Sequence, residues 1–388
     1  MPSSSVSFEF SSRPRSRPSD KSSGHDVFWH PSLLDPPPHN CTPGLITLLR
    51  RALVSQHECG HIQRAVLCTN RAVHISREDF DSRWGCGYRN YMMACAVLMD
   101  QRSQDAYAAL FKRHEPPGVR SLQSLIERAW EAGFDEEGAG QLRRRLYDTT
   151  KWIGTVELFV AFTYLGIPSQ LADFVLPRRT DTEPLIDWIS DYFSPPDQHE
   201  HSSFRGIWKD ASAVTQTDRL PLVLQHNGHS RTIVGYEINR KGQIVLLVFD
   251  PSKRIRPPLR HMALSNFKWS EVGSVAKDRS GTQKLRQHFT QLSLPRHPKH
   301  AIPLSSDSRP TKRTRAGATA VVMSRVKPEV IEVGSDGEAV EGAADDHVSM
   351  SDSRNLKEKY QILWFPLHDP LTEQEKDARR VITSAKIC

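Results

Sequence analysis

The 388-residue chain is short of cysteine and has no long apolar run. Its six cysteines show none of the paired spacing of small disulfide-rich secreted domains, and a chain of this length does not need disulfide staples. The first 26 residues contain no apolar core of a signal peptide, and no stretch reaches the roughly 20 apolar residues that cross a bilayer. We therefore expect a reduced, soluble protein of the cytoplasm, the nucleus or both, without a membrane partner.

Two further classes of partner lack support in the sequence. The net charge of +7 is spread over both tails and several loops, without a basic stripe carrying interleaved aromatics, so we do not expect nucleic acid as a partner. Cys59 and His61 in "HECGH", together with Cys68, would begin a zinc site, but no second ligand pair follows. We expect neither a metal nor a cofactor.

The chain divides into one folded region and two segments without hydrophobic periodicity. Residues 1–42 are rich in Ser, Pro and Arg, and residues 296–355 combine prolines with Ser/Asp clusters, so we expect both to be disordered. The remaining residues, 43–295 plus 356–388, predict one α+β domain. Its helices are expected over 42–56, 121–134, 150–167, 184–193 and 371–387, and its clearest strands over 220–224, 233–236, 244–249 and 360–366.

One cysteine stands where a loop turns into an apolar helix. In "DFDSRWGCGYRNYMMACAVLMD", Cys86 lies between two glycines and two residues after a tryptophan. A free cysteine is most often a small buried hydrophobe. A helix N-terminus, however, lowers the pKa of a thiol, and the thiolate is the reactive form. Both interpretations of Cys86, as inert core residue and as nucleophile, have to be weighed against its partners.

A cysteine nucleophile needs a base and a third group that orients the base. His229 begins the strand of "HSRTIVGYE", and Asp250 ends the strand "IVLLVFD". If these strands pair as an antiparallel hairpin, the start of the first lies beside the end of the second. Each residue alone has an ordinary explanation, since His229 could cap a turn and Asp250 could end a strand before Pro251. Together with Cys86 they predict a papain-type arrangement.

The motifs "WGCGYRN", "QHNGHSRTIVGYE" and "FDPS" resemble the zinc-finger-containing ubiquitin peptidase family, which is related to the proteases of the ubiquitin-fold modifier. The resemblance extends through "SLIERAWEAGFDEEGAGQL" and "KWIGTVELFVAF". It implies a papain-like cysteine protease fold, in which Cys86 is the nucleophile, His229 the base and Asp250 its orienting partner. In the modifier proteases the aspartate precedes the histidine as Asp-Pro-His, whereas Ser252 occupies that position here.

The resemblance also implies a substrate. It predicts a deubiquitinating thiol isopeptidase that cleaves after the C-terminal glycine of ubiquitin, in polyubiquitin chains joined through lysine sixty-three of ubiquitin. Larger family members carry zinc fingers before the catalytic domain, and the first 42 residues here have no paired Cys/His spacing. Two alternatives remain: a protease for another ubiquitin-like modifier, and a non-catalytic ubiquitin-binding adaptor. The intact triad argues against the adaptor.

An oxyanion hole needs donors beside the nucleophile. The backbone N–H of Cys86, at the helix start, is the natural first donor. For the second we expect either Gln225, which would share a strand face with His229, or His74. Gln225 could equally be a polar residue of a strand edge.

The approach of the substrate tail has its own candidates. Trp84 and Gly85 are expected to shape a narrow slot beside the cysteine. The tail of ubiquitin has arginines before its two terminal glycines, so acidic residues should line the approach, and the candidates are Asp135, Glu136 and Glu157. For Asp135 and Glu136 a solvated helix end is the competing explanation.

The expected insertion contains one further motif. "PEVIEVGSDGE" places Val330, Ile331 and Val333 before acidic residues, the pattern of a SUMO-interacting segment that adds a strand to a sheet edge. Such patterns also arise by chance in acidic segments. The basic run "RPTKRTR" at 309–315 could direct the protein to the nucleus.

Overall fold

The computed structural model contains two groups of strands and nine helices within the residues it describes. Those residues are 27–33, 35–176, 182–194, 212–226, 228–267, 324–326 and 358–387. The SUMO-interacting motif of Val330, Ile331 and Val333 lies outside them, as does the basic run at 309–315. Among the described helices, none has the length and apolar character needed to cross a membrane.

A mixed, mostly antiparallel sheet forms the centre of the described fold. Its strand order is β11-β4-β10-β6-β7-β2-β5, with β8 paired to β7 and β9 paired to β8. A separate ladder joins β1 (Cys41–Thr42) to β3 (His74–Ile75). The strands of the large sheet are β2 (Ile62–Leu67), β4 (Gln170–Leu176), β5 (Val214–Gln216), β6 (Leu222–His226), β7 (His229–Asn239), β8 (Ile244–Phe249), β9 (Ser324–Val326), β10 (Glu358–Trp364) and β11 (Ala385–Ile387).

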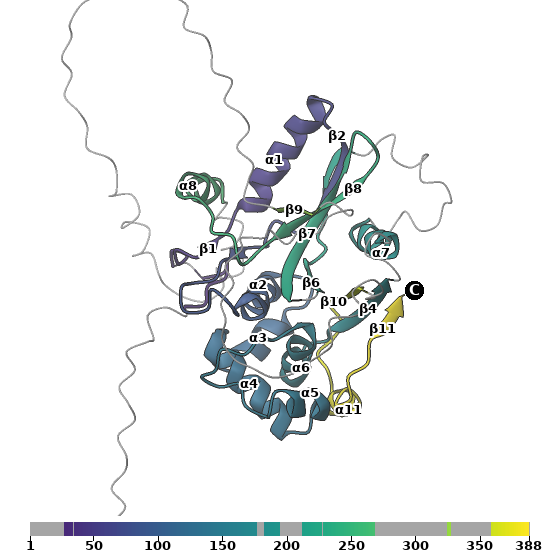
Figure 1. Ribbon diagram of the computed structural model, residues 1–388. Coiled ribbons are helices and arrows are strands. Elements are labelled where there is room, and N and C mark those ends of the chain that lie inside the picture. The colour runs from purple at the N-terminus through teal and green to yellow at the C-terminus, as the bar shows by residue number, and fades with distance from the viewer. Residues whose placement is uncertain are drawn as a thin grey trace, which may run out of the picture.

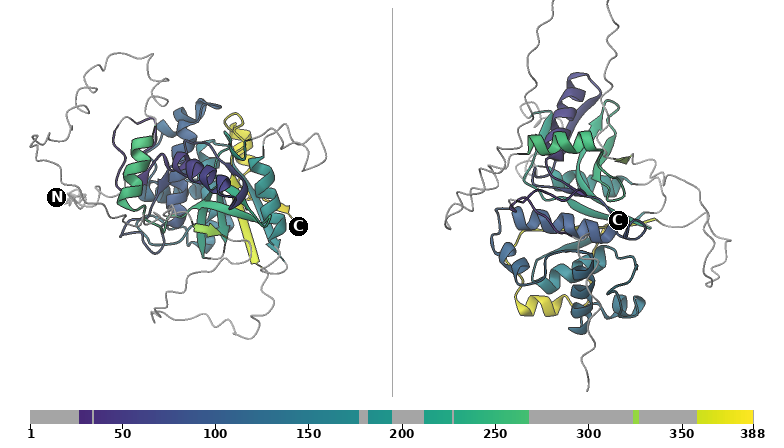
Figure 2. Two further views of the ribbon diagram at one scale, coloured as in Figure 1. Left: turned by 90° about the horizontal axis from the view of Figure 1, so that it is seen from above. Right: turned by 90° about the vertical axis from the view of Figure 1, so that its left-hand side faces the viewer.

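The helices gather at the two ends of the molecule, with α2 between them (Figure 1). Helix α1 packs against β2, and α8 packs against α1 and β1. The group α3 to α6 lies at the opposite end, as the right-hand view of Figure 2 also shows. The helices are α1 (Leu45–Glu58), α2 (Cys86–Asp100), α3 (Ala106–Lys112), α4 (Val119–Glu131), α5 (Glu136–Gln141), α6 (Thr155–Leu165), α7 (Glu183–Phe193), α8 (Pro257–Asn266) and α11 (Glu373–Ala378).

Helix α2 is buried on all sides because it packs between the sheet and the helical end. Its only residue that is not buried is Met99. A helix that is apolar around its whole circumference belongs in the core of a protein, and the run from Tyr91 to Leu98 has that composition. The nucleophile candidate therefore stands at the first residue of the most deeply enclosed helix.

Strand β10, which follows the expected insertion, lies within the sheet, as its apolar sequence predicts. β10 lies between β4 and β6, and Ile362 and Leu363 are fully buried there. The capping box of Thr372 and Glu375 is also present at the start of α11. The helix is shorter than expected, however: it ends at Ala378, and β11 then pairs in parallel with the outer side of β4.

The structure differs from the expected organisation before the first helix and inside the expected insertion. Order begins before residue 43, since Trp29 is buried and Thr42 pairs with His74 in the β1–β3 ladder. Thr42 consequently does not cap the first helix, which begins at Leu45 after Gly44 in the left-handed conformation (φ 81°). Within the expected insertion 296–355, residues 324–326 form β9 and pair with β8.

Candidate active site

The loop before α2 is held by a buried ion pair. Asp81 and Arg89 contact each other at 2.7 Å and both side chains are fully buried. The Asp81 carboxylate also accepts a hydrogen bond from the backbone N–H of Glu78 at 2.6 Å. A Cβ on Gly85 would lie 2.1 Å from Asp81 Oδ2, so this glycine is required by the packing of the loop. That requirement does not depend on a substrate slot, and it applies to the residue directly before Cys86.

The hairpin of β7 and β8 carries the other two residues, and a bulge sets its register. The pairing shifts at Gly235, whose φ is 146°, so that Thr232 pairs with Phe249. Continued by one residue, this register puts Arg231 opposite Asp250. Because side chains alternate between the faces of a strand, the histidine two residues before Arg231 projects on the same side.

The structure brings Cys86, His229 and Asp250 together. His229 Nε2 lies 3.0 Å from Asp250 Oδ1, and the histidine side chain also hydrogen-bonds the Cys86 thiol. The carboxylate has further donors: Arg231 Nε reaches Oδ2 at 3.0 Å, and the N–H and hydroxyl of Ser252 reach Oδ1 at 2.8 and 2.7 Å. Asp250 is therefore anchored independently of the histidine that it orients.

The electrostatics favour a charged cysteine–histidine pair. Burial raises the pKa of the Cys86 thiol, but hydrogen bonds from His229 and Ser230 and the charge of His229 lower it to about 7. Burial lowers the pKa of His229, and its hydrogen bonds to Asp250 and Cys86 outweigh this and raise it. The pKa of Asp250 is raised by burial and brought far below its usual range by the hydrogen bond and charge of His229. Near neutral pH, a thiolate and an imidazolium can therefore coexist.

Gln225 lies on the opposite strand face from the one expected. It pairs with Ser230, while His226 pairs with His229, so Gln225 shares the face of Ser230, the residue that contacts Cys86. Its Nε2 donates to the carbonyl of His226 at 2.9 Å, and its buried Oε1 has no hydrogen-bond partner among the described residues. The amide thus lies on the strand face of Ser230, and its NH₂ group is engaged by the His226 carbonyl.

His74 binds the main chain of the triad residue Asp250. Its side chain is fully buried, and Nε2 donates to the backbone carbonyl of Asp250 at 3.0 Å. The ring also packs edge-on against Phe249, with centroids 5.6 Å apart. Since this N–H is committed to a carbonyl, His74 has no donor left for an oxyanion. The expectation that it forms the oxyanion hole is wrong.

Two of the acidic tail candidates have local structural partners. Asp135 adopts a left-handed conformation (φ 48°) and caps α5 by accepting a hydrogen bond from the Gly138 N–H at 3.1 Å. Glu136 forms an ion pair with Arg144, and both side chains are more than half exposed. A helix end accounts for both residues.

Glu157 has a different setting. Its carboxylate accepts a hydrogen bond from the Gly154 N–H at 2.7 Å, and burial raises its pKa. A Cβ on Gly154 would lie 3.4 Å from Gln225 Oε1 and 3.7 Å from Glu157 Oε2, so the two side chains approach each other beside the start of α6. Tyr88 is close enough to both Glu157 and Cys86 for their charges to add to the effect of burial in raising its pKa. Glu157 is thus held at the start of α6, within electrostatic range of Tyr88 on the helix that carries the thiol.

Trp84 is largely enclosed. Its side chain is 9% exposed and packs edge-on against Tyr88, with ring centroids 5.1 Å apart, and against Phe80 at 6.4 Å. These contacts hold the residue two positions before the nucleophile. The structure gives Trp84 a packing role in the loop.

Four residues around the triad were missed by sequence reasoning, namely Asn90, Ser230, Arg231 and Ser252. Strand alternation could have found Arg231, because it lies two residues after His229 and so shares its face. No sequence signal pointed to the other three. Among the described residues there is also no group of three or more His, Cys, Asp or Glu side chains that could hold a metal ion.

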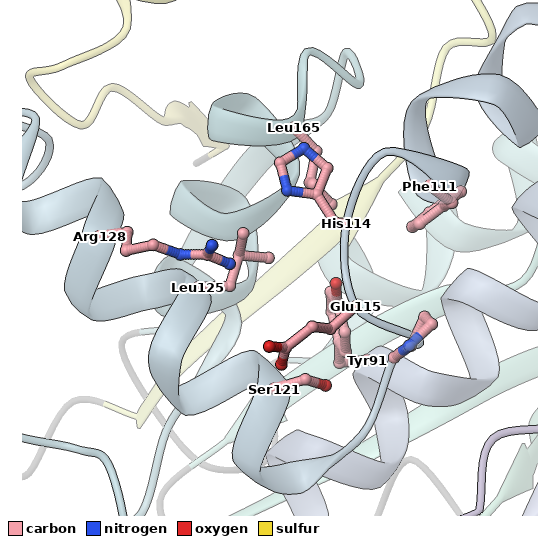
Figure 3. Close-up of a pocket in the computed structure, with 9 residues that line it drawn as sticks. Tyr91, Phe111, His114, Glu115, Ser121, Leu125, Arg128 and Leu165 are labelled. Carbon is pink, nitrogen blue, oxygen red and sulfur yellow. The ribbon is translucent and has the colours of Figure 1, made fainter. Parts of the chain in front are cut away.

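A small cavity lined by none of the triad residues lies among the helices (Figure 3). Its volume of about 10 Å³ is close to that of a single water probe. The lining residues are Tyr91, Phe111, His114, Glu115, Pro117, Ser121, Leu125, Arg128 and Leu165. None belongs to the triad, so this cavity is not the catalytic site.

A cysteine at the start of a buried helix, facing a histidine and an aspartate on an antiparallel hairpin, defines a papain-like cysteine peptidase site. The α+β architecture around it is of the same class. The chain belongs to peptidase family C78, whose family model matches residues 61–293. This match includes all three triad residues.

The similar curated proteins carry ubiquitin in their names. "Zinc finger-containing ubiquitin peptidase 1" of Homo sapiens is 35% identical over 213 residues, which cover 54% of this chain and 34% of that protein. "Ubiquitin carboxyl-terminal hydrolase mug105" of Schizosaccharomyces pombe is 33% identical over 176 residues, covering 45% and 62%. The chain therefore spans about a third of the length of the zinc-finger-containing relatives. A crystal structure of UfSP from C. elegans is similar at 15% identity and a TM-score of 0.32, covering 55% of this chain and 32% of that one.

Proposed function

We propose that the protein is a thiol isopeptidase that cleaves after the C-terminal glycine of ubiquitin. The observation that carries the proposal is the connected set of Cys86, His229 and Asp250 inside a C78 peptidase domain. The choice of ubiquitin is supported by the names of the curated relatives. An adaptor without catalysis would not need a thiol whose pKa is lowered to about 7.

The geometry supports a two-step reaction. The Cys86 thiolate attacks the carbonyl carbon of the terminal glycine, and the His229 imidazolium gives its proton to the departing lysine amine, which leaves a thioester. Water then attacks the thioester, with His229 accepting its proton, and the thiol leaves as the glycine carboxylate is released. Asp250 stays ionised throughout and holds the imidazole in orientation.

One backbone donor and one side-chain donor would stabilise the oxyanion of the tetrahedral intermediate. The first is the N–H of Cys86, which has no partner within its own helix because it is the first residue. The second is the Gln225 amide, after its Nε2 leaves the His226 carbonyl. Glu157, beside Gln225, would attract an arginine of the ubiquitin tail.

The test is a panel of probes in which ubiquitin, SUMO and other ubiquitin-like modifiers each carry a cysteine-reactive C-terminus. We expect ubiquitin alone to label the protein, at Cys86, and the Cys86→Ala variant to remain unlabelled. Labelling by a different modifier would reassign the substrate. If no probe reacts while the ubiquitin probe still binds, the adaptor is the better description.

Three finer proposals rest on sequence resemblance and motifs. We propose a preference for chains joined through lysine sixty-three of ubiquitin, which cleavage of a panel of di-ubiquitins of defined linkage would test. We propose SUMO binding through Val330, Ile331 and Val333, which alanine substitution and capture on immobilised SUMO would test. We also propose residence in the cytoplasm, the nucleus or both, to be tested by imaging the tagged protein with and without residues 309–315.

A further inference from the structure

A buried polar ladder connects α2 to the strand that carries the catalytic histidine. Asn90 Nδ2 donates to Ser230 Oγ at 2.9 Å, and Thr232 Oγ1 donates to Asn90 Oδ1 at 2.7 Å. All three residues are at most 2% exposed. Asn90 lies one helical turn after Cys86, so the ladder ends beside the thiol.

The ladder has a direction, because each hydroxyl has a single proton to give. The Thr232 hydroxyl donates its proton to the Asn90 carbonyl oxygen. This hydrogen bond orients the amide so that its NH₂ group faces Ser230. Ser230 Oγ accepts from that NH₂, and its own proton is therefore left for another acceptor. The Cys86 sulfur is a hydrogen-bond partner of Ser230, through both its side chain and its backbone N–H.

We propose that Ser230 is a further catalytic residue, whose hydroxyl donates a hydrogen bond to the Cys86 thiolate and is oriented for this by Asn90 and Thr232. The thiolate then has two side-chain donors, the His229 imidazolium and the Ser230 hydroxyl. A donor to the charged form stabilises it relative to the neutral thiol. Ser230 keeps this role when His229 has passed its proton to the leaving amine and the thiolate must act as leaving group again.

The charged and titratable groups on the neighbouring elements also bear on the pKa values of Cys86 and His229. His229 on β7 carries the opposite charge to the thiolate, and Asp250, after β8, faces His229 rather than the sulfur. Arg231, on the same strand, holds Asp250 and lowers the pKa of His229 by its charge, after the larger effects of burial and hydrogen bonding. Tyr88 on α2 interacts electrostatically with both Cys86 and Glu157 of α6, and both Tyr88 and Glu157 stay unchanged in the variants below.

The experiment measures the pH dependence of Cys86 alkylation by iodoacetamide, followed at the Cys86 peptide by mass spectrometry. It needs no ubiquitin, so it tests the Ser230 contact even if the proposed substrate is wrong. For the wild type we expect half-maximal reactivity near pH 7. For Ser230→Ala we expect the midpoint to rise by roughly one pH unit, the size of shift that loss of a hydrogen bond to a charged group produces. Ser265→Ala, at an exposed serine of α8, is the matched control and should leave the midpoint unchanged.

Two substitutions at Thr232 separate loss of the hydrogen bond from a folding effect at Ser230. Thr232→Val nearly keeps the shape of the side chain, and Thr232→Ser keeps its hydroxyl. Valine removes the donor to Asn90, so the midpoint should rise, by less than in Ser230→Ala, whereas serine should restore the wild-type midpoint. Melting temperatures accompany each variant. If Ser230→Ala and Thr232→Val lower the melting temperature but leave the alkylation midpoint in place, the ladder is a structural connection only and Ser230 is not catalytic.

Discussion

Two thiols on helix α2 have pKa values that are shifted in opposite directions. Cys86 at the start of α2 and Cys95 in its interior are both buried, at 3% and 0% exposure. Burial alone raises the pKa of each. The pKa of Cys95 stays well above its ordinary value of 9.0, even though a hydrogen bond with Tyr91 lowers it in part, whereas the pKa of Cys86 falls to about 7.

The difference comes from the partners at each position. Cys86 stands at a helix N-terminus, where unpaired N–H groups favour an anion, and faces a histidine whose charge Asp250 stabilises. Cys95 has turns of its own helix on both sides, with Tyr91 as its hydrogen-bond partner. Burial therefore does not decide whether a cysteine is reactive. The charge and donors that face the sulfur decide it.

The largest expected effect is at Cys86. Cys86→Ala should reduce cleavage of a fluorogenic ubiquitin substrate to background, because the nucleophile is gone. It should leave ubiquitin binding and the melting temperature nearly unchanged, since the substitution is small and local. Retained activity, or a melting temperature lower by many degrees, would place Cys86 in the same class as Cys95.

The histidine and the aspartate should differ in effect. His229→Ala should lower kcat by on the order of 10³-fold, within the usual range for removal of a general acid–base group. Asp250→Asn should lower it less than this, because an asparagine orients the histidine in papain-like Cys-His-Asn proteases. Both kcat values are measured on the same ubiquitin substrate. Activity of His229→Ala equal to the wild type would remove His229 from the mechanism.

The pH dependence should separate the two thiols directly. The lowered pKa of Cys86 means that its thiolate population, and with it kcat/KM, rises as pH increases through about 7. Cys95 should stay unmodified by iodoacetamide across this range, because its raised pKa keeps it a neutral, buried thiol. Peptide-level mass spectrometry after alkylation at several pH values gives both curves. Equal modification of the two cysteines at pH 7 would contradict the comparison.

The smallest effect on catalysis is expected at Cys95. Cys95→Ala removes a single buried sulfur, so the free energy of unfolding should fall by about 1–2 kcal/mol. Activity should remain within about twofold of wild type, since the residue touches no reacting group. Urea unfolding together with kcat/KM on the ubiquitin substrate measures both. A large loss of kcat at unchanged stability would show that the interior of α2 contributes to the site.

The sequence predicts the elements better than their junctions. α4, α6 and the β7–β8 hairpin have clear periodicity and are present as expected. The bulge at Gly235 was not foreseen, although it decides the register. A Cβ there would lie 2.1 Å from the carbonyl oxygen of Val66 on β2, a contact between strands far apart in the chain. Without the shift, Thr232 instead of Arg231 would lie opposite Asp250.

The sequence did not predict the surroundings of His74 and Gln225, for a similar reason. His74 carries the same donors whether it faces an oxyanion or the carbonyl of Asp250, and only the position of β3 chose the carbonyl. Gln225 lies on the other face because the register of β6 against β7 pairs it with Ser230 and not with His229. The local sequence around each residue contains no information about these distant neighbours.

By itself the sequence determined the identity of the three reactive groups and the elements that carry them. A glycine-flanked cysteine before an apolar helix and two strands joined by a short turn are local patterns, which depend on propensity and periodicity. The tertiary structure alone decided which donors surround the thiol. The ladder from Thr232 through Asn90 to Ser230 joins a helix to a strand some 140 residues away in sequence. Such contacts depend on how α2 packs against β7, and packing is a property of the whole core rather than of any segment.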